Sequence, residues 1–198
     1  MKHEEFHAFS NKKFDDYSEK KREEAIKAFG CEIAENANDL TSGELKGFIE
    51  EKMGEYFDKY YVKEVKIKEK EIKKEESEKD IIIYVPYDGN VEMLRLKPSV
   101  SSDETLKVFL NEKEIGVKVK DLASKTKEEI SEETDKIVEE LKKNLDSLKK
   151  DIEECNKELK KGLKDEAEKI KKRIEKDKEK LKEIKEKEDK IYNEEEFF

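Results

Sequence analysis

The sequence has few of the residues that usually build catalytic and metal sites. It contains two histidines and two cysteines among 198 residues. Cys31 and Cys155 are far apart and do not form a C-x-x-C pair, so we expect reduced thiols and not a disulfide. Each cysteine also falls on a predicted helical face where a small apolar residue packs well, so we expect both to be buried. We predict no catalytic residue and no enzymatic activity.

Apolar residues are scarce as well. Hydrophobic residues make up 33% of the chain and charged residues 50%. This is too little apolar material for one compact globule, so part of the chain should be elongated or disordered. The longest aliphatic stretch, Ile81 to Ile83, is far shorter than a membrane span, and the first residues are charged where a signal peptide would be apolar. We therefore expect a cytoplasmic protein without a membrane partner.

Neither sign of charge dominates the sequence. The 45 basic and 54 acidic residues give a net charge of -9, and the two signs are interspersed. Nucleic-acid binding is therefore not favoured, and the basic residues from Lys171 to Lys182 are interpreted as a solvated helix face. The sequence has no G-x-G-x-x-G or P-loop pattern, so we expect no cofactor and no evident small-molecule ligand.

The N-terminus contains one match to a metal-binding motif. His3, Glu4 and His7 fit H-E-x-x-H, in which a helix presents two imidazoles to zinc and a glutamate acts as the base. No further histidine is available as a third ligand, and we expect no preceding structure that would bury the motif. We interpret this segment as a frayed, solvated terminus without a metal, and a small zinc hydrolase remains a remote alternative.

Two amphipathic helices are predicted in the first third of the chain. The first runs from Ser10, as the N-cap, to about Asn36. The second begins at a capping box formed by Thr41 and Glu44 and carries an aromatic face up to Tyr60. The aromatic stretch also suits a base-stacking platform, but its helical spacing favours a place in the core.

The middle of the chain is predicted to form an antiparallel sheet of four or five strands. After residue 61 the apolar residues alternate with period two, and Ile81 to Val85 form a β-branched run. The residues 88–90, Asp-Gly-Asn, predict a tight hairpin turn to a second arm at residues 91–96. A further hairpin is predicted at residues 106–110 and 115–119. Pro86 is expected at a sheet edge or a bulge.

The C-terminal third is predicted to be helical. Residues 126–191 contain no proline and one glycine, Gly162. Their apolar residues recur at steps of three, four or seven, which indicates a coiled-coil seam. An unbroken helix of this length would extend on the order of 100 Å and would need a partner along the seam. The candidate interaction residues are Leu141, Leu145, Leu148, Ile152, Leu159, Leu163, Ile170, Ile174, Leu181 and Ile184.

Two partners for this seam remain open at this point. The helix can fold back on itself through a turn near Asn156 to Gly162, or it can pair with a second molecule. The heptad is interrupted at Gly162, which favours the hairpin. The stretch lacks the polar or proline-rich residues of a clear turn, which favours a single helix.

One stretch resembles a known group of proteins. The residues 85–90, V-P-Y-D-G-N, lie before a charged helical C-terminus that includes D-I-E-E-C-N at residues 151–156. This arrangement resembles a set of uncharacterised bacterial proteins with a V-P-aromatic-x-G hairpin, over about half of the chain. The resemblance implies structural motifs and no particular activity.

These patterns together predict an α+β protein. Two N-terminal helices should pack on a small antiparallel sheet in a head domain at residues 1–122. A coiled-coil-like segment with a disordered tip should follow at residues 123–198. The expected function is a non-enzymatic interaction or assembly subunit of a cytoplasmic bacterial or archaeal complex, which oligomerises or docks through the seam. The alternative is a nucleic-acid-associated accessory factor, for example of a phage or defence locus.

Overall fold

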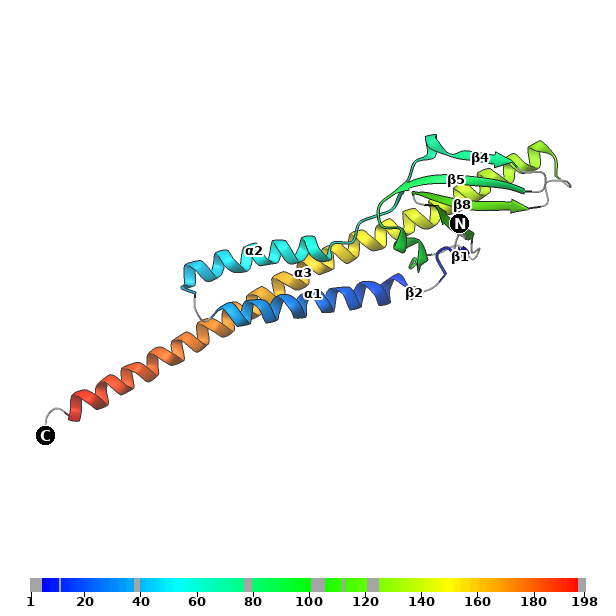
Figure 1. The fold of residues 1–198 in the computed structure, drawn as a ribbon. Coiled ribbons are helices and arrows are strands. Elements are labelled where there is room, and N and C mark those ends of the chain that lie inside the picture. Colours follow the sequence, from blue (N-terminus) through cyan, green and yellow to red (C-terminus); the bar gives the residue numbers. More distant parts are fainter. Residues whose placement is uncertain are drawn as a thin grey trace. The chain divides into compact units, whose positions relative to one another are not determined.

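The computed structural model confirms the predicted α+β class (Figure 1). It describes residues 5–10, 12–37, 40–76, 80–100, 106–111, 113–120 and 125–195. The chain forms two compact units, each built from two separate stretches. The sheet unit consists of Met1–Lys20 and Val62–Asn156, and the helical unit of Lys21–Tyr61 and Lys157–Phe198. The sequence instead predicted one continuous head followed by one helical segment.

The sheet unit contains a six-stranded sheet within its described residues. The order is β1-β7-β8-β5-β3, with β4 also paired to β5, and all of these pairs are antiparallel. The predicted hairpin at residues 106–119 is confirmed, and two short strands are additional to the prediction: one at the N-terminus and one in the charged stretch after residue 67. The strands are β1 (Glu5–His7), β3 (Lys66–Ile67), β4 (Lys73–Glu76), β5 (Asp80–Asp88), β7 (Lys107–Asn111) and β8 (Glu114–Lys120).

One face of this sheet is the core of the unit. Phe6, Val108, Val117 and Ile83 are register partners across four neighbouring strands, and all four are buried. Residues directly opposite each other on paired strands point to the same face of a sheet, so these side chains share one face. The helix α3 (Lys127–Glu195) contributes to the same core with the part of its seam from Leu141 to Cys155. The N-terminal half of α3 is therefore part of the sheet unit.

The predicted hairpin arm at residues 91–96 was wrong. The chain there forms the 3-10 helix η3 (Val91–Arg95), followed by β6 (Leu96–Lys97), which pairs in parallel with β2 (Lys12–Lys13). The Asn90 side chain accepts a hydrogen bond from the Glu92 N–H at 3.1 Å, which starts the helical turn. A 3-10 turn also brings the adjacent residues Met93 and Leu94 into one core, whereas a strand would point them to opposite faces.

Pro86 does not lie at a sheet edge, because β5 is an internal strand between β8 and β3. On the β3 and β4 side, the neighbouring chain is interrupted by the 3-10 helix η2 (Glu69–Glu71). The Pro86 carbonyl accepts a hydrogen bond from the Lys68 N–H at 2.8 Å at this interruption. In an antiparallel sheet the N–H and the carbonyl of one residue point to the same side of the strand. The position where Pro86 lacks an N–H therefore faces the same interruption. The interrupted neighbour makes the proline compatible with an internal strand.

A buried side chain fixes the backbone where the second stretch of the sheet unit begins. The Asn156 Oδ1 accepts a hydrogen bond from the Val62 N–H at 2.9 Å, and the Asn156 Nδ2 donates one to the Val62 carbonyl at 3.0 Å. Both residues are buried, with exposed fractions of 8% and 1%. The amide therefore satisfies both backbone groups of a residue that has no strand or helix partner there.

The helical unit has a core of its own. It contains the apolar faces of α1 (Phe14–Asn36) from Ala25 onward, of α2 (Ser42–Tyr60) and of the C-terminal half of α3. The capping box predicted for Thr41 and Glu44 is confirmed, with the Thr41 N–H donating to Glu44 at 2.9 Å. The predicted N-cap at Ser10 was wrong: its hydroxyl donates to the His7 carbonyl at 2.7 Å, and α1 begins at Phe14.

Of the two arrangements left open for the C-terminal segment, the structure shows the single helix, because α3 continues through Gly162 without a turn. Gly162 lies directly against the side chain of Ile26 on α1: an added Cβ would lie 2.4 Å from its Cδ1 atom. The glycine is therefore a packing site and not a turn. The helices α1 and α2 cover the face that a second arm of α3 would have covered. The predicted disordered tip lies partly outside the described residues, and α3 itself extends to Glu195.

None of the helices in the described part of the chain combines the length and apolar character that crossing a membrane requires.

Candidate functional site

The predicted seam of α3 is covered by the chain itself over most of its length. Its residues from Leu141 to Ile152 are buried in the core of the sheet unit, and Leu159, Leu163 and Ile170 are buried in the core of the helical unit. The exposure changes at Ile174, which is half-buried. Leu181 and Ile184 follow with exposed fractions of 58% and 51%. The candidate site is this open end of the seam, within the helical unit.

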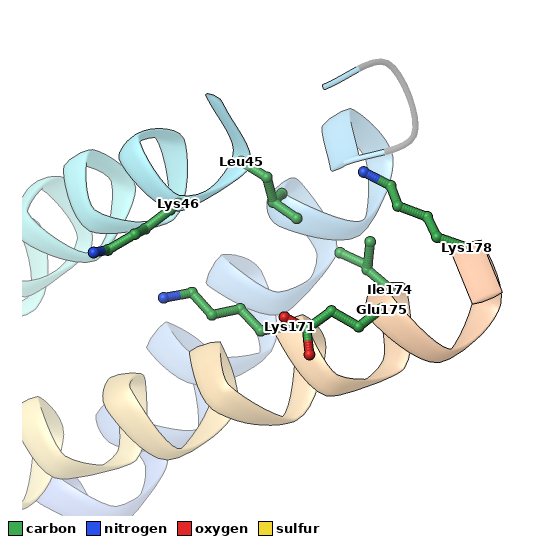
Figure 2. Close-up of a pocket in the computed structure, with 6 residues that line it drawn as sticks. All are labelled: Leu45, Lys46, Lys171, Ile174, Glu175 and Lys178. Carbon is green, nitrogen blue, oxygen red and sulfur yellow. The ribbon is translucent and has the colours of Figure 1, made fainter. Parts of the chain in front are cut away.

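A pocket marks the point where the cover of the seam ends. It has a volume of about 270 Å³ and lies between the start of α2 and the last covered turn of α3. Its apolar lining residues are Leu45 and Ile174, and its charged lining residues are Lys46, Lys171, Glu175 and Lys178 (Figure 2). The Lys178 ammonium donates to the Leu40 carbonyl at 3.0 Å, which fastens the connection before α2 to α3. The pocket therefore combines two apolar residues with a predominantly basic set of charged residues.

Basic residues border the open seam on both sides. With 100° between successive residues of a helix, the positions within about 80° of Ile174 on one side of the seam are all lysines in the described segment up to residue 188. The other side carries Arg173 and further lysines. The glutamates of this segment project mainly from the opposite face. The flanking residues are Lys171, Lys178, Lys182 and Lys185 on one side and Arg173, Lys176, Lys180 and Lys187 on the other.

The sequence interpretation missed this segregation. It counted lysines and glutamates between residues 171 and 182 as an interleaved, solvated face, because the two signs alternate along the chain. The helical projection instead places most lysines beside the seam and most glutamates on the opposite face of the helix. Exposure of Leu181 shows that these lysines border an uncovered apolar strip. The signal was present in the sequence, but its meaning depends on where α1 and α2 stop covering α3.

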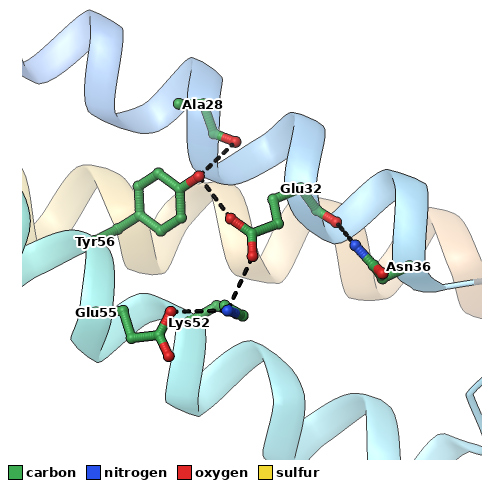
Figure 3. Close-up of polar contacts among 6 residues, drawn as sticks. All are labelled: Ala28, Glu32, Asn36, Lys52, Glu55 and Tyr56. Atoms are coloured by element: carbon green, nitrogen blue, oxygen red, sulfur yellow. Dashed lines mark hydrogen bonds and ion pairs between the residues drawn. The ribbon is translucent and has the colours of Figure 1, made fainter.

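A polar cluster joins α1 to α2 in the same unit (Figure 3). The Tyr56 hydroxyl donates to Glu32 Oε2 at 2.7 Å, and Lys52 Nζ lies 3.0 Å from Glu32 Oε1 and 2.8 Å from Glu55. The hydrogen bond from Tyr56, followed by that from Lys52, lowers the pKa of Glu32. The same bond to Glu32 raises the pKa of Tyr56 to about 12. Neither Glu32 nor Tyr56 is therefore suited to proton transfer at neutral pH, and we interpret the cluster as a structural contact between α1 and α2.

The Glu32 contacts predict an acid-sensitive contribution to stability. A carboxylate whose pKa in the folded protein is below its ordinary value of 4.5 stabilises the fold above that value. The stabilisation is lost as the pH falls through the folded pKa. We expect the free energy of unfolding to decrease between about pH 5 and pH 3 more steeply in the wild type than in Glu32→Gln. Denaturant titrations across this range measure the slope.

The exposed Glu35 on the same helix provides the control for this prediction. Glu35→Gln should retain the steep slope of the wild type. Equal slopes for Glu32→Gln and the wild type would contradict the role assigned to Glu32.

The structure does not support the zinc reading of the N-terminus. His3 and Glu4 lie outside the described residues, and His7 lies in strand β1 instead of on a helix. The interpretation as a frayed, solvated terminus was wrong from residue 5 onward, because Phe6 is buried in the sheet core. Among the described residues, no group of three or more histidine, cysteine, aspartate or glutamate side chains is arranged to hold a metal ion.

The two cysteines differ in their environment. Cys155 is buried in the core of the sheet unit, as predicted. Cys31 is exposed, so its predicted burial was wrong. It lies on α1 next to Gly30, and both line a shallow surface pocket of the helical unit. The buried face of α1 is formed by Ala25, Phe29 and Ile33 instead.

The aromatic face of α2 is half-buried against the helical core. Tyr56 and Tyr60 stack with ring centroids 6.2 Å apart, and the Lys59 ammonium lies within 5.6 Å of both ring centroids. The rings already have core and cation contacts, so this face is primarily structural, as its spacing indicated.

Comparison of the chain with protein-family models, with curated proteins and with solved structures finds no match.

Proposed function

We propose that this protein is a non-enzymatic docking subunit of a cytoplasmic bacterial or archaeal complex. Its docking surface is the open seam, defined as Ile174, Leu181 and Ile184 of α3. One observation carries this proposal: Leu181 and Ile184 are exposed by more than half while they continue the line of a seam that is otherwise buried. Adjacent large aliphatic side chains on one helix face are typical of an interaction site.

The neighbouring core supports the proposal. Leu159, Leu163 and Ile170 show that this face of α3 packs well against other helices. The cover ends at the pocket of Leu45 and Ile174, so a partner helix can continue the same packing from that point. Leu181 is seven residues after Ile174 and Ile184 is three further on, which is the a, a, d spacing of a coiled coil.

Replacing the exposed seam residues tests this function. We expect Leu181→Asp with Ile184→Asp to reduce retention of a specific host protein on the immobilised chain by more than about tenfold, because two apolar contacts become charges. The free energy of unfolding should change by less than about 0.5 kcal/mol, since both side chains are exposed. Quantitative mass spectrometry of the retained proteins and denaturant unfolding measure these effects.

Val100→Asp is the matched control, because Val100 is 74% exposed and lies in the sheet unit. It introduces the same chemical change away from the seam and should leave retention intact. The captured protein must also bind the wild type when both are purified. Equal retention by the double variant would overturn the proposal.

A nucleic-acid-associated role is the second candidate. The observation that favours it is the basic border of the open seam, since lysines and arginine neutralise phosphates. A steeply salt-dependent gel shift would support this role. Absence of a shift at low salt would remove it.

A further inference from the structure

We infer that the partner of the open seam is an amphipathic helix whose apolar face is bordered by acidic residues. This inference rests on the proposed function and specifies the chemistry of the partner. It follows from the charges next to the seam. Among the described residues, those that flank Leu181 and Ile184 on either side of the helix are basic. This border selects a partner of opposite charge.

A second copy of the chain does not meet this requirement. With Ile174 and Leu181 as a positions and Ile184 as a d position, the e positions are Lys178 and Lys185. The g positions are Arg173, Lys180 and Lys187. In a parallel pair, each g position faces the e position of the next heptad of the partner, and in an antiparallel pair g faces g and e faces e. Each of these contacts between copies would join two cations, which disfavours self-association.

An acidic border on the partner reverses the sign of these contacts. Glutamate at the facing e and g positions would pair with Lys180, Lys185 and Lys187, whose side chains are exposed. Near the pocket, an apolar partner side chain would reach Leu45 and Ile174. A neighbouring carboxylate on the partner would lie among the lysines there. The pocket and the border therefore favour the same kind of helix.

Two acidic residues within the seam favour a protein partner over a lipid surface. Asp177 occupies a d position and Glu188 an a position, in line with Leu181, and both are exposed. Insertion of this face into hydrocarbon would bury their carboxylates, which is costly. A partner helix can instead place a lysine or arginine opposite them, because single polar residues at a and d positions set the register of coiled coils. The expected partner is acidic at its borders and carries a cation in its seam.

Designed peptides test this inference on the full chain. A three-heptad peptide with isoleucine and leucine at a and d and glutamate at e and g is compared with a peptide that has lysine at e and g. We expect the acidic peptide to bind at least about tenfold more tightly in fluorescence anisotropy. Lys180→Glu with Lys185→Glu should remove this preference or invert it. Lys178 is left unchanged, because it holds the Leu40 carbonyl.

Lys63→Glu with Lys113→Glu is the matched control, because both side chains are exposed in the sheet unit and the change in net charge is the same. This control should retain the preference of the wild type. Retention of the preference by the Lys180 and Lys185 variant would overturn the inference.

The other outcomes separate this inference from the proposed function. If neither peptide binds while host capture still depends on Leu181 and Ile184, the docking function stands and the acidic helix is wrong. A dimer in light scattering that Leu181→Asp with Ile184→Asp dissociates would identify a second copy and overturn the inference. Binding to vesicles of phosphatidylserine and phosphatidylcholine in preference to the acidic peptide would identify a membrane and also overturn it.

Discussion

Asn156→Leu should lower the free energy of unfolding by about 3 kcal/mol, because it removes two buried hydrogen bonds and leaves the Val62 N–H and carbonyl without their partner. Leucine has a similar size, so the loss would arise from unsatisfied polar groups and not from a cavity. Urea unfolding followed by circular dichroism measures the change.

The control for Asn156 is an exposed position on the same helix. Lys150→Leu introduces the same side chain at the surface and should change stability by less than about 0.5 kcal/mol. A stability of Asn156→Leu within about 1 kcal/mol of the wild type would contradict the role of the amide, because a single net hydrogen bond contributes about that much.

Gly89→Ala should also destabilise the protein by about 3 kcal/mol, for a reason in the backbone. Gly89 has a φ of +110°, which is unfavourable for residues with a Cβ. An added Cβ would lie 2.0 Å from the carbonyl oxygen of Glu64, and a backbone atom cannot move away as a side chain can. Thermal or urea unfolding of the purified variant measures the effect.

Gly54→Ala provides the opposite expectation in the same protein. Gly54 lies within α2, and apart from its chain neighbours and the adjacent helix backbone no atom lies within 4 Å of the position that its Cβ would occupy. Alanine should therefore stabilise the helix by about 0.5–1 kcal/mol. If both substitutions changed stability by the same amount and sign, the steric argument at Gly89 would be wrong.

Local signals predicted the elements that depend on local chemistry. The capping box at Thr41 determines the start of α2, and the sequence contains both of its partners. The hairpin of β7 and β8 follows from alternation around a short polar turn. In these cases, the residues that decide the structure are within a few positions of each other, so a single sequence is sufficient.

Tertiary contacts decided the elements that were predicted wrongly. Asp-Gly-Asn at residues 88–90 suits a hairpin turn, but the close approach of the Glu64 backbone to Gly89 and the burial of Met93 and Leu94 favour η3. In the sequence Gly162 resembles an interruption of the seam, whereas in the structure it makes room for the side chain of Ile26. The periodicity indicated that the α3 seam needs a partner, but it does not specify that the sheet, α1 and α2 supply most of it. For the same reason, the sequence did not distinguish Leu181 and Ile184 from the buried members of the seam.

The participation of α3 in both cores has a consequence for synthesis on the ribosome. The sheet strands and the helices α1 and α2 leave the exit tunnel before the residues that complete their cores, which lie at 141–155 and 159–170. Neither unit can therefore finish folding while translation continues through the first two thirds of the chain, in contrast to proteins whose domains fold one after another. A premature stop before residue 141 would leave both apolar faces open at once. Such a fragment would be a substrate for chaperones and proteases over its whole length.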